Sequence, residues 1–201
     1  NGLEFLHANN IIHRDLKLDN ILIFGDRVRI CDLGISKKIY ENDDNHTLGN
    51  VGTSAYRAPE VYSGADFGYD EKVDIWSLGC LIYEFITGNS LFKGSSDIVR
   101  ISNIVRIIPT TQSDLDMLNL DMINICKCNT TENYKIPKLG NGKLLYELKI
   151  IIQKMLQLNP FNRPSCIEIK NMLLLNNLLD INLLKTHRIN IINQREFTAI
   201  I

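Results

Sequence analysis

The chain has 201 residues, enough for one domain of ordinary size with a buried core. Its 22 lysines and arginines almost balance its 23 aspartates and glutamates, so the protein has no overall positive field that would attract nucleic acid or anionic lipid. We therefore expect neither nucleic acid nor membrane as a partner, and look for function in local sites.

The first third of the chain predicts a helix, a hairpin and a loop. Residues 1–10 have apolar positions at helical spacing without a capping residue before them, so we expect the chain to start inside a helix and to carry no signal peptide. Short apolar runs at 21–23 and 28–30 flank a Gly-Asp pair and predict a small β-hairpin. Residues 33–57 are mostly polar or small and predict an exposed loop.

Helical periodicity dominates the remainder. The predicted helices cover residues 73–87, 97–107, 143–156 and 165–178. The first contains the longest apolar segment, but that segment includes two acidic residues and is shorter than the ~20 residues of a membrane span, so it predicts a buried helix, ended by Gly88. The stretch 109–142 is rich in threonine, asparagine and serine and predicts a surface insert.

Three motifs in a fixed order are the strongest chemical signal. His13-Arg14-Asp15-Leu16-Lys17-Leu18-Asp19-Asn20 comes first, then Asp32-Leu33-Gly34, then Ala58-Pro59-Glu60. They resemble the catalytic loop, the magnesium-binding motif and the end of the activation segment of serine/threonine protein kinases. Each motif alone is weak, but chance is a poor explanation for all three in this order with a hairpin between the first two.

The resemblance covers residues 1–178 and implies a fold: the mainly α-helical C-terminal lobe of a kinase domain, whose small β-hairpin carries catalytic and metal-binding residues. The catalytic loop would be 13–20, the activation segment 32–60, the insert 109–142 and the tail 179–201. No G-x-G-x-x-G loop followed by a strand lysine occurs in the sequence. We therefore expect the N-terminal lobe to be absent, this polypeptide to be inactive alone, and the full-length protein to be an active kinase.

Spacing within the hairpin predicts a metal site. Asn20 and Asp32 lie equally far from Asp26 at its tip, so antiparallel pairing should set them side by side. A carboxylate and an amide oxygen are hard ligands suited to Mg²⁺. By resemblance, Asp32 would hold Mg²⁺ between the phosphates of ATP, and Asn20 would hold the second ion.

The resemblance also assigns the remaining catalytic roles. Asp15 would accept or orient the proton of the substrate hydroxyl, and Lys17 would place positive charge near the γ-phosphoryl oxygens of ATP. The position of Lys17, together with Thr53, which matches a family threonine that bridges Asp15 and Lys17, favours serine and threonine as acceptors. Taken singly, these polar residues are more simply solvated loop residues.

Further positions are implied to be structural. Arg163, within Asn159-Pro160-Phe161-Asn162-Arg163-Pro164, resembles the kinase arginine that pairs with Glu60. Asp74 resembles the residue of a buried helix that accepts hydrogen bonds from the catalytic-loop backbone. His13 and Gly34 take structural roles within their motifs.

Arg14 resembles the arginine of kinases that are controlled by phosphorylation of the activation loop, where it pairs with the phosphate. Thr47 is the first candidate for the modified residue, ahead of Ser36, Thr53 and Ser54. An ordinary loop threonine is the alternative. Besides protein substrates and ATP, the resemblance implies an activating kinase or a regulatory subunit as a partner.

Three segments resemble the cyclin-dependent and MAP kinases: residues 56–60, 91–94 and 107–110. Those kinases often select serine or threonine followed by proline. Gly52 and Ser54-Ala55 depart from the residues that this group usually has beside the threonine. Leu33 stands where the magnesium-binding motif usually has phenylalanine, which predicts an apolar plug at that position.

Two other functions stay open. A pseudokinase-like scaffold would bind partners without catalysis, although the intact set of Asp15, Lys17, Asn20 and Asp32 argues against it. A metal-dependent phosphohydrolase could use two of the same carboxylates, but no further run of acidic or histidine ligands supports it.

The five cysteines are odd in number, and Cys31 and Cys80 lie in apolar runs where buried free thiols are common. We therefore expect an intracellular protein of the cytoplasm or nucleus. Cys126 and Cys128 form a C-x-C pair without further ligands nearby, which argues against a metal site there.

Overall fold

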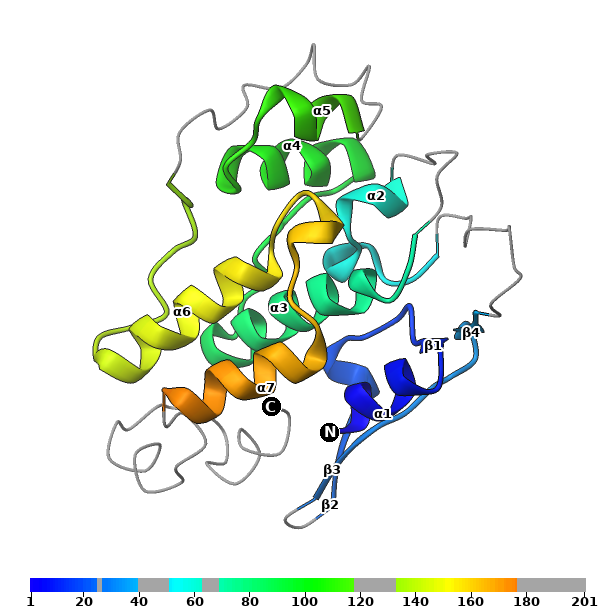
Figure 1. The fold of residues 1–201 in the computed structure, drawn as a ribbon. Coiled ribbons are helices and arrows are strands. Elements are labelled where there is room, and N and C mark those ends of the chain that lie inside the picture. Colours follow the sequence, from blue (N-terminus) through cyan, green and yellow to red (C-terminus); the bar gives the residue numbers. More distant parts are fainter. Residues whose placement is uncertain (25–26, 40–50, 63–68, 118–132, 177–201) are drawn as a thin grey trace.

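The computed structural model describes residues 1–24, 27–39, 51–62, 69–117 and 133–176. Its α-helices are α1 (Gly2–Ala8), α2 (Pro59–Tyr62), α3 (Lys72–Thr87), α4 (Asp97–Ile107), α5 (Gln112–Met117), α6 (Lys143–Met155) and α7 (Cys166–Leu175). The short 3₁₀ helices are η1 (Leu18–Asn20), η2 (Ser54–Tyr56) and η4 (Pro160–Asn162). The strands are β1 (Ile11–Ile12), β2 (Ile21–Phe24), β3 (Arg27–Ile30) and β4 (Lys37–Lys38). The predicted mainly helical fold with a small hairpin is confirmed (Figure 1).

Helix α3 runs through the middle of the molecule and packs along α6 (Figure 1). Ile75, Trp76 and Leu81 on it have no exposed surface, so they form the centre of the core. Gly79 permits the close approach of α6, because a Cβ there would lie 3.1 Å from side-chain atoms of Met155 and Leu156. Gly88 ends the helix in the left-handed conformation, φ 68°. The predicted buried helix is thus confirmed.

The other predicted helices are also present. α4 has the predicted bounds, and the side chain of Ser96 caps its first turn. α6 ends one residue earlier than expected. α7 begins after a capping box, in which the side chains of Ser165 and Glu168 each bond the backbone amide of the other residue. No helix among these described segments is long and apolar enough to cross a bilayer.

The hairpin forms with a register that corrects the expectation from spacing. Ile21 pairs with Ile30 and Phe24 with Arg27, so the strand pairing is shifted by one residue from the register expected around Asp26. Asn20 consequently lies opposite Cys31, whose amide donates to the Asn20 carbonyl at 2.9 Å. Asp32 follows one residue later and is not the cross-strand partner of Asn20.

A second sheet, which the sequence pattern did not predict, joins β1 to β4. Ile11 pairs with Lys38 and Ile12 with Lys37, and the Ile39 amide donates to the Asn10 carbonyl at 2.8 Å. The segment after Asp32-Leu33-Gly34 is therefore paired with the strand that leads into residues 13–20, although it was expected to be an exposed loop.

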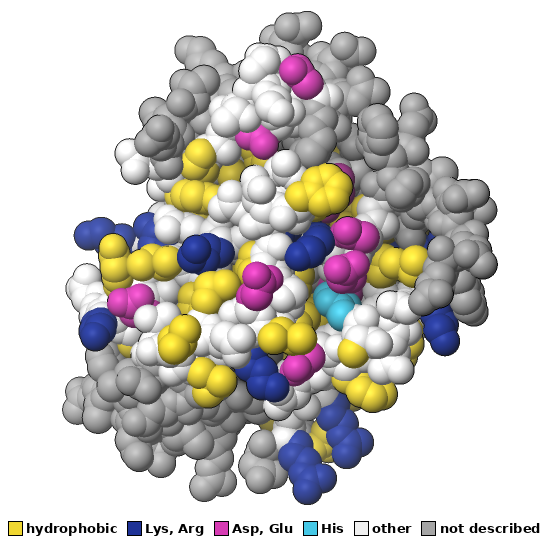
Figure 2. Space-filling model, in the orientation of Figure 1, with side chains coloured by type: hydrophobic (Ala, Val, Ile, Leu, Met, Phe, Trp, Pro, Cys, Tyr) yellow, Lys and Arg dark blue, Asp and Glu magenta, His cyan; other side chains and the backbone are white. Residues whose placement is uncertain are grey.

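The predicted surface insert is only partly at the surface. Thr110, Ile136 and Leu139 are buried, and the Lys135 amide donates to the Ile107 carbonyl at 2.8 Å. Apolar residues spaced irregularly in a polar stretch give no periodic signal, so their burial could not be read from the sequence. On the face shown in Figure 2, basic, acidic and hydrophobic side chains are interspersed among the coloured residues, without a large area of one charge.

Candidate active site

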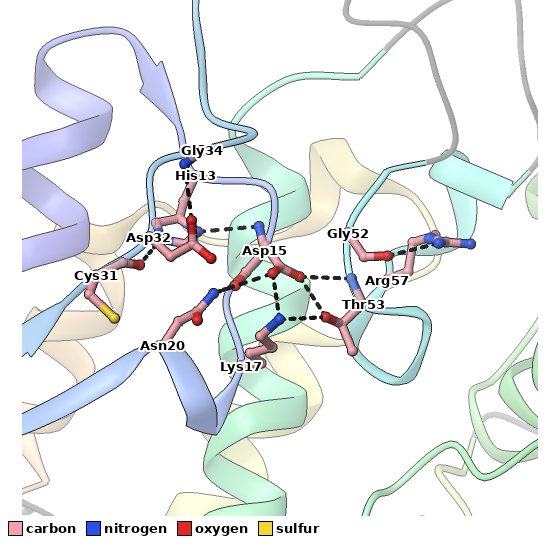
Figure 3. A network of polar contacts seen from close by, with 10 residues as sticks. All are labelled: His13, Asp15, Lys17, Asn20, Cys31, Asp32, Gly34, Gly52, Thr53 and Arg57. Carbon is pink, nitrogen blue, oxygen red and sulfur yellow. Dashed lines mark hydrogen bonds and ion pairs between the residues drawn. The ribbon is translucent and has the colours of Figure 1, made fainter.

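Asp15 lies at the centre of a network of polar contacts that joins the loop after β1 to the segment before η2 (Figure 3). Lys17 Nζ donates to Asp15 Oδ2 at 2.7 Å. The backbone N–H and the hydroxyl of Thr53 both donate to Asp15 Oδ1, each at 2.7 Å. Burial alone would raise the pKa of Asp15, but the hydrogen bonds from Lys17 and Thr53 outweigh it and hold this pKa below the ordinary value. Asp15 is therefore an ionised carboxylate at neutral pH.

Lys17 is bound on two sides. Its ammonium donates to Asp15 and, at 3.1 Å, to the Thr53 hydroxyl. The hydrogen bond to Asp15 raises the pKa of Lys17 against the opposing effect of burial, and the nearby carboxylates of Asp19 and Asp32 add to the increase. The structure therefore brings Asp15, Lys17 and Thr53 together, and Thr53 bridges the other two.

Asn20 is a buried residue at the end of η1. Its Nδ2 donates to the Asp15 carbonyl at 2.8 Å and approaches Asp15 Oδ2 at 3.3 Å. Both contacts use the amide nitrogen, which leaves Oδ1 as the atom of this side chain that can bind a cation.

Asp32 follows β3 in the left-handed backbone conformation, φ 61°, which is unfavourable for a residue with a Cβ. Its Oδ1 accepts from the Gly34 amide at 3.1 Å, and a Cβ on Gly34 would lie 3.0 Å from the same oxygen. The exposed carboxylate lies beside Asp15 and Asn20 (Figure 3). The side chains at 15, 17, 20 and 32 therefore converge on one region.

The donors present fit Mg²⁺. Among the residues that the structure describes, no group of three or more His, Cys, Asp or Glu side chains could hold a metal by itself. The Asn20 amide oxygen and the Asp32 carboxylate are two hard oxygen donors, and Mg²⁺ typically takes few protein ligands and completes its shell with water and phosphate oxygens. A site of this kind needs the phosphates of a nucleotide to be complete.

His13 connects the catalytic loop to the end of β3. Its side chain has no exposed surface. Nδ1 accepts from the Asp15 amide at 3.2 Å, so Nε2 carries the hydrogen of the neutral ring and donates to the Cys31 carbonyl at 2.9 Å. A single buried ring thus holds the backbone next to Asp15 and the backbone next to Asp32.

Asp74 fixes the same loop from the core. Its carboxylate is fully buried and accepts from the amides of His13, at 2.8 Å, and Arg14, at 2.9 Å. Arg14 has a left-handed backbone, φ 69°, and these bonds hold it there. The third contact of Asp74 is with His7 Nε2, at 2.9 Å, a residue for which the motif comparison gave no signal.

Arg163 forms the buried ion pair that the sequence predicts. Its guanidinium donates to the two carboxylate oxygens of Glu60 at 2.5 and 2.7 Å. It also donates to the carbonyls of Leu158 and Gln157 and lies over the Trp76 ring, 5.1 Å from its centroid. This bidentate pair joins α2 to the loop before α7 and is structural.

Gly52 and Arg57 form a second arrangement that the sequence did not reveal. Gly52 has φ 83°, and a Cβ there would lie 2.3 Å from the Arg14 carbonyl oxygen, so only glycine fits. Arg57 Nη2 donates to the Gly52 carbonyl at 2.8 Å (Figure 3), and Nη1 contacts Asp97 at 3.2 Å. Arg57 lies within residues 56–60, but the sequence pattern there was interpreted only as a resemblance to the cyclin-dependent and MAP kinases.

The remaining candidates are Arg14, Thr47 and Leu33. Arg14, which was expected to pair with a phosphate, donates from Nε to the Ile35 carbonyl at 2.5 Å. Thr47, like Cys126 and Cys128, lies outside the described residues, so its regulatory role stays a prediction. Leu33 is 50% exposed and lines a cavity of about 670 Å³. No described element packs over it, so its role as an apolar plug stays a prediction.

A family model and individual relatives point to the same protein family. A family model described as the protein kinase domain matches residues 1–175. The putative serine/threonine-protein kinase L670 of Acanthamoeba polyphaga mimivirus is 37% identical over 168 residues, which cover 82% of this chain and 27% of that protein. Mitogen-activated protein kinase 15 of Xenopus laevis is 34% identical over 170 residues, 80% of this chain and 28% of that protein. Cyclin-dependent kinase-like 2 of Mus musculus is 34% identical over 181 residues, 84% of this chain and 30% of that protein. The chain thus spans 27–30% of the length of these relatives.

Proposed function

Since this chain belongs to the protein kinase family, we propose that the protein carrying it transfers the γ-phosphoryl group of ATP to serine or threonine hydroxyls of protein substrates. The observation that supports this proposal most is the convergence of Asp15, Lys17, Asn20 and Asp32 on one region (Figure 3). Thr53, which bridges Asp15 and Lys17, supports serine and threonine acceptors.

Asp15 Oδ2 is the atom proposed to receive the substrate hydroxyl. Oδ1 already accepts two short hydrogen bonds from Thr53. Oδ2 accepts one short bond from Lys17 and only a 3.3 Å contact from Asn20, so a lone pair on this oxygen is weakly used. A hydroxyl there would have its proton directed to an ionised carboxylate as the phosphoryl group transfers.

Lys17 and the two oxygen ligands would counter the negative charge of the phosphates. The ammonium of Lys17, kept protonated by Asp15, would stabilise negative charge on the transferring phosphoryl oxygens. Asn20 Oδ1 and Asp32 would hold Mg²⁺, which neutralises the charge of the phosphates when bound. His13 and Asp74 keep the two ligands and Asp15 in register by holding the loop backbone.

The test compares two aspartates of the same loop in the complete kinase. Asp15→Asn should lower kcat for peptide phosphorylation by about 10² to 10⁴, the range typical of a positioned general base. Asp19→Asn is the matched control, because Asp19 is exposed and, among the described contacts, makes no hydrogen bond or ion pair with the Asp15 carboxylate; its charge acts on Lys17 only from a distance, so kcat should fall far less than in Asp15→Asn. Near-normal turnover of the folded Asp15→Asn variant would refute the proposal and favour a scaffold.

We further propose that the acceptor residue is followed by proline. The Gly52 carbonyl accepts from Arg57, and Arg57 is held in turn by Val51, Asp97 and the face of the Tyr62 ring. Arg57 thus directs this carbonyl, next to Thr53, toward its own guanidinium, and we propose that the carbonyl is therefore not directed at the backbone N–H of the residue after the acceptor. Proline has no N–H, whereas any other residue there would leave a donor unpaired, at about 1–3 kcal/mol.

Peptides that differ at one position test this preference in the complete kinase. A Ser-Pro peptide should exceed its Ser-Ala counterpart in kcat/KM by roughly 10-fold or more, and a Ser-(N-methylalanine) peptide should recover much of the difference, since it also lacks the N–H. Arg57→Gln should reduce the ratio, whereas Arg106→Gln, a change at an exposed arginine of α4, should not. Equal rates for the proline and alanine peptides would refute the preference.

The proposal also includes the division of the domain: residues 1–178 supply the C-terminal lobe, and a nucleotide-binding lobe is supplied by other residues of the complete protein. Leu22, Ile23 and Phe24 of β2 are 38–59% exposed, so neither face of this strand is fully covered by the described residues. The isolated 201-residue chain should therefore not phosphorylate peptides. Activity of the isolated chain, abolished by Asp15→Asn, would contradict this division.

A further inference from the structure

Outside the proposed active site, three side chains from distant parts of the chain form a Cys-His-Asp cluster. Cys166 Sγ lies 3.5 Å from His7 Nδ1, and His7 Nε2 lies 2.9 Å from Asp74 Oδ2. The three residues come from α7, α1 and α3. A thiol whose neighbouring imidazole is oriented by a carboxylate has the arrangement that activates sulfur as a nucleophile.

The position of Cys166 in α7 favours the thiolate. Cys166 is the first residue of this ten-residue helix, directly after the N-cap Ser165, where the helix dipole stabilises negative charge. The thiol is partly exposed and lines the cavity of about 670 Å³ between α1, the hairpin and α7. A small reagent therefore has a path to the sulfur.

The positive charge of His7 also favours the thiolate form of Cys166. Burial opposes protonation of this ring, but the hydrogen bonds to Asp74 and Cys166 outweigh burial and raise the pKa of His7 to about 9. At neutral pH the ring is an imidazolium, with Nε2 donating to Asp74 and Nδ1 facing the sulfur. The other charged groups that line the cavity are Arg27, Arg29, Lys170 and Glu4, and the last two form a pair at 3.1 Å.

We propose that Cys166 is an activated thiol and that hydrogen peroxide oxidises it to a sulfenic acid, with His7 as the proton donor. The thiolate sulfur attacks one oxygen of the peroxide, an S–O bond forms and the O–O bond breaks. The departing hydroxide takes the Nδ1 proton of His7 and leaves as water. Sulfur is oxidised by two electrons, the peroxide is reduced by two, and the imidazole ends neutral.

The other described cysteines provide internal references. Cys80 is fully buried, and burial raises the pKa of its thiol strongly, so it should stay inert while the chain is folded. Cys31 is partly exposed, and among the described contacts no histidine nitrogen approaches its sulfur. The proposal goes beyond phosphoryl transfer and can be tested in the 201-residue chain whether or not that chain is part of an active kinase.

Alkylation kinetics test the activation. The rates at which iodoacetamide labels Cys166 and Cys31 are compared by peptide mass spectrometry at pH 6.5. Cys166 of the wild type should react faster than Cys31 by roughly 10-fold or more. His7→Gln should slow labelling at pH 6.5 by roughly 10-fold or more, whereas Lys170→Gln, which removes a charge from α7 but leaves His7, should change it by less than about threefold.

Peroxide supplies the second measurement. Hydrogen peroxide with dimedone should give a sulfenic acid adduct at Cys166 before Cys31, and this order should be lost in His7→Gln. Protection of Cys80 reports that each variant is folded; if His7→Gln exposes Cys80, the wild-type labelling rates and the adduct order decide the outcome. Equal labelling of Cys166 and Cys31 in wild type, an equal rate in folded His7→Gln, or an adduct at Cys31 first would each overturn the proposal.

Discussion

Glu60 and Arg163 carry charges into the interior of the molecule. The Arg163 side chain has no exposed surface and that of Glu60 is 9% exposed. Removing two charges from water is costly, and the pair is stable only because the geometry is bidentate and further carbonyls accept from the guanidinium. Single residues such as these hold segments together that are 103 positions apart in sequence.

Breaking this pair should be strongly destabilising. Glu60→Gln leaves the guanidinium charge buried without its carboxylate, and we expect the free energy of unfolding to fall by about 3–5 kcal/mol in urea denaturation. The double change Glu60→Met with Arg163→Met should lose less than the sum of the single changes, because no unpaired charge remains. Additive losses would show that the two charges are not coupled.

His7 should make stability dependent on alkaline pH. Its pKa in the folded chain is about 9, against an ordinary 6.5, so the folded state binds the proton more tightly than the unfolded state does. The resulting stabilisation is complete below pH 6.5, declines between 6.5 and 9, and is absent above 9. It amounts to at most roughly 3 kcal/mol.

The dependence is measured as the free energy of unfolding between pH 6 and 10, in wild type and His7→Gln. The wild type should lose stability across this interval, and the variant, which has no titrating ring at this position, should show a flatter curve. Identical slopes for the two proteins would contradict the assignment of the effect to His7.

Residues close in sequence to each helix end determine where the helices begin and end. Ser165 and Glu168 satisfy two amides at the start of α7, and Gly88 ends α3 in a conformation that other residues adopt at a cost. These signals are present in the sequence within a few residues of the helix end, which is why α3, α4 and α6 were predicted to within one residue at each end.

The two serine caps should differ in strength. The Ser165 hydroxyl accepts from the Glu168 amide at 3.3 Å and donates to the Glu168 carboxylate at 2.8 Å, whereas the Ser96 hydroxyl accepts only one bond, of 3.4 Å. Ser165→Ala should therefore lower the free energy of unfolding by about 1 kcal/mol, and Ser96→Ala by less. Calorimetry or urea denaturation would decide, and a larger loss for Ser96→Ala would contradict the comparison.

At the scale of the whole molecule, α3 is the element to which the catalytic loop is fixed. Asp74 accepts two amides of that loop, while α3 itself is held by α6 through the contact at Gly79. A left-handed Arg14 and a left-handed Asp32 are conformations that isolated peptides seldom keep, so the surrounding core must maintain them.

Asp74→Asn should loosen the loop without unfolding the chain. The amide keeps one acceptor oxygen but replaces the other with a donor that faces backbone N–H groups. Hydrogen exchange at the amides of His13 and Arg14 should accelerate by roughly 10-fold or more, in line with the loss of a hydrogen bond to a charged acceptor, and kcat of the complete kinase should fall in parallel. Unchanged exchange at both amides would contradict the role of Asp74 as the anchor.

Periodicity, turn residues and contiguous motifs are local properties of the chain, so they predicted the hairpin, the chemical groups and the helices α1, α3, α4, α6 and α7, but not α2 or α5. The three motifs, in the order in which they occur along the chain, were enough to select Asp15, Lys17, Asn20 and Asp32 as candidates. It could not give their relative positions: spacing from Asp26 predicted Asn20 opposite Asp32, whereas the observed register places Asn20 opposite Cys31.

Contacts between residues that are distant in sequence became known from the fold. The contact between Thr53 and Asp15, the Gly52 carbonyl held by Arg57, and the cluster of His7, Asp74 and Cys166 join parts of the chain that no local pattern relates. The physical reason is that such contacts depend on how helices and strands pack around α3, and packing is set by the combined shape and burial of many side chains. A linear sequence lists those side chains but not the geometry in which they come together.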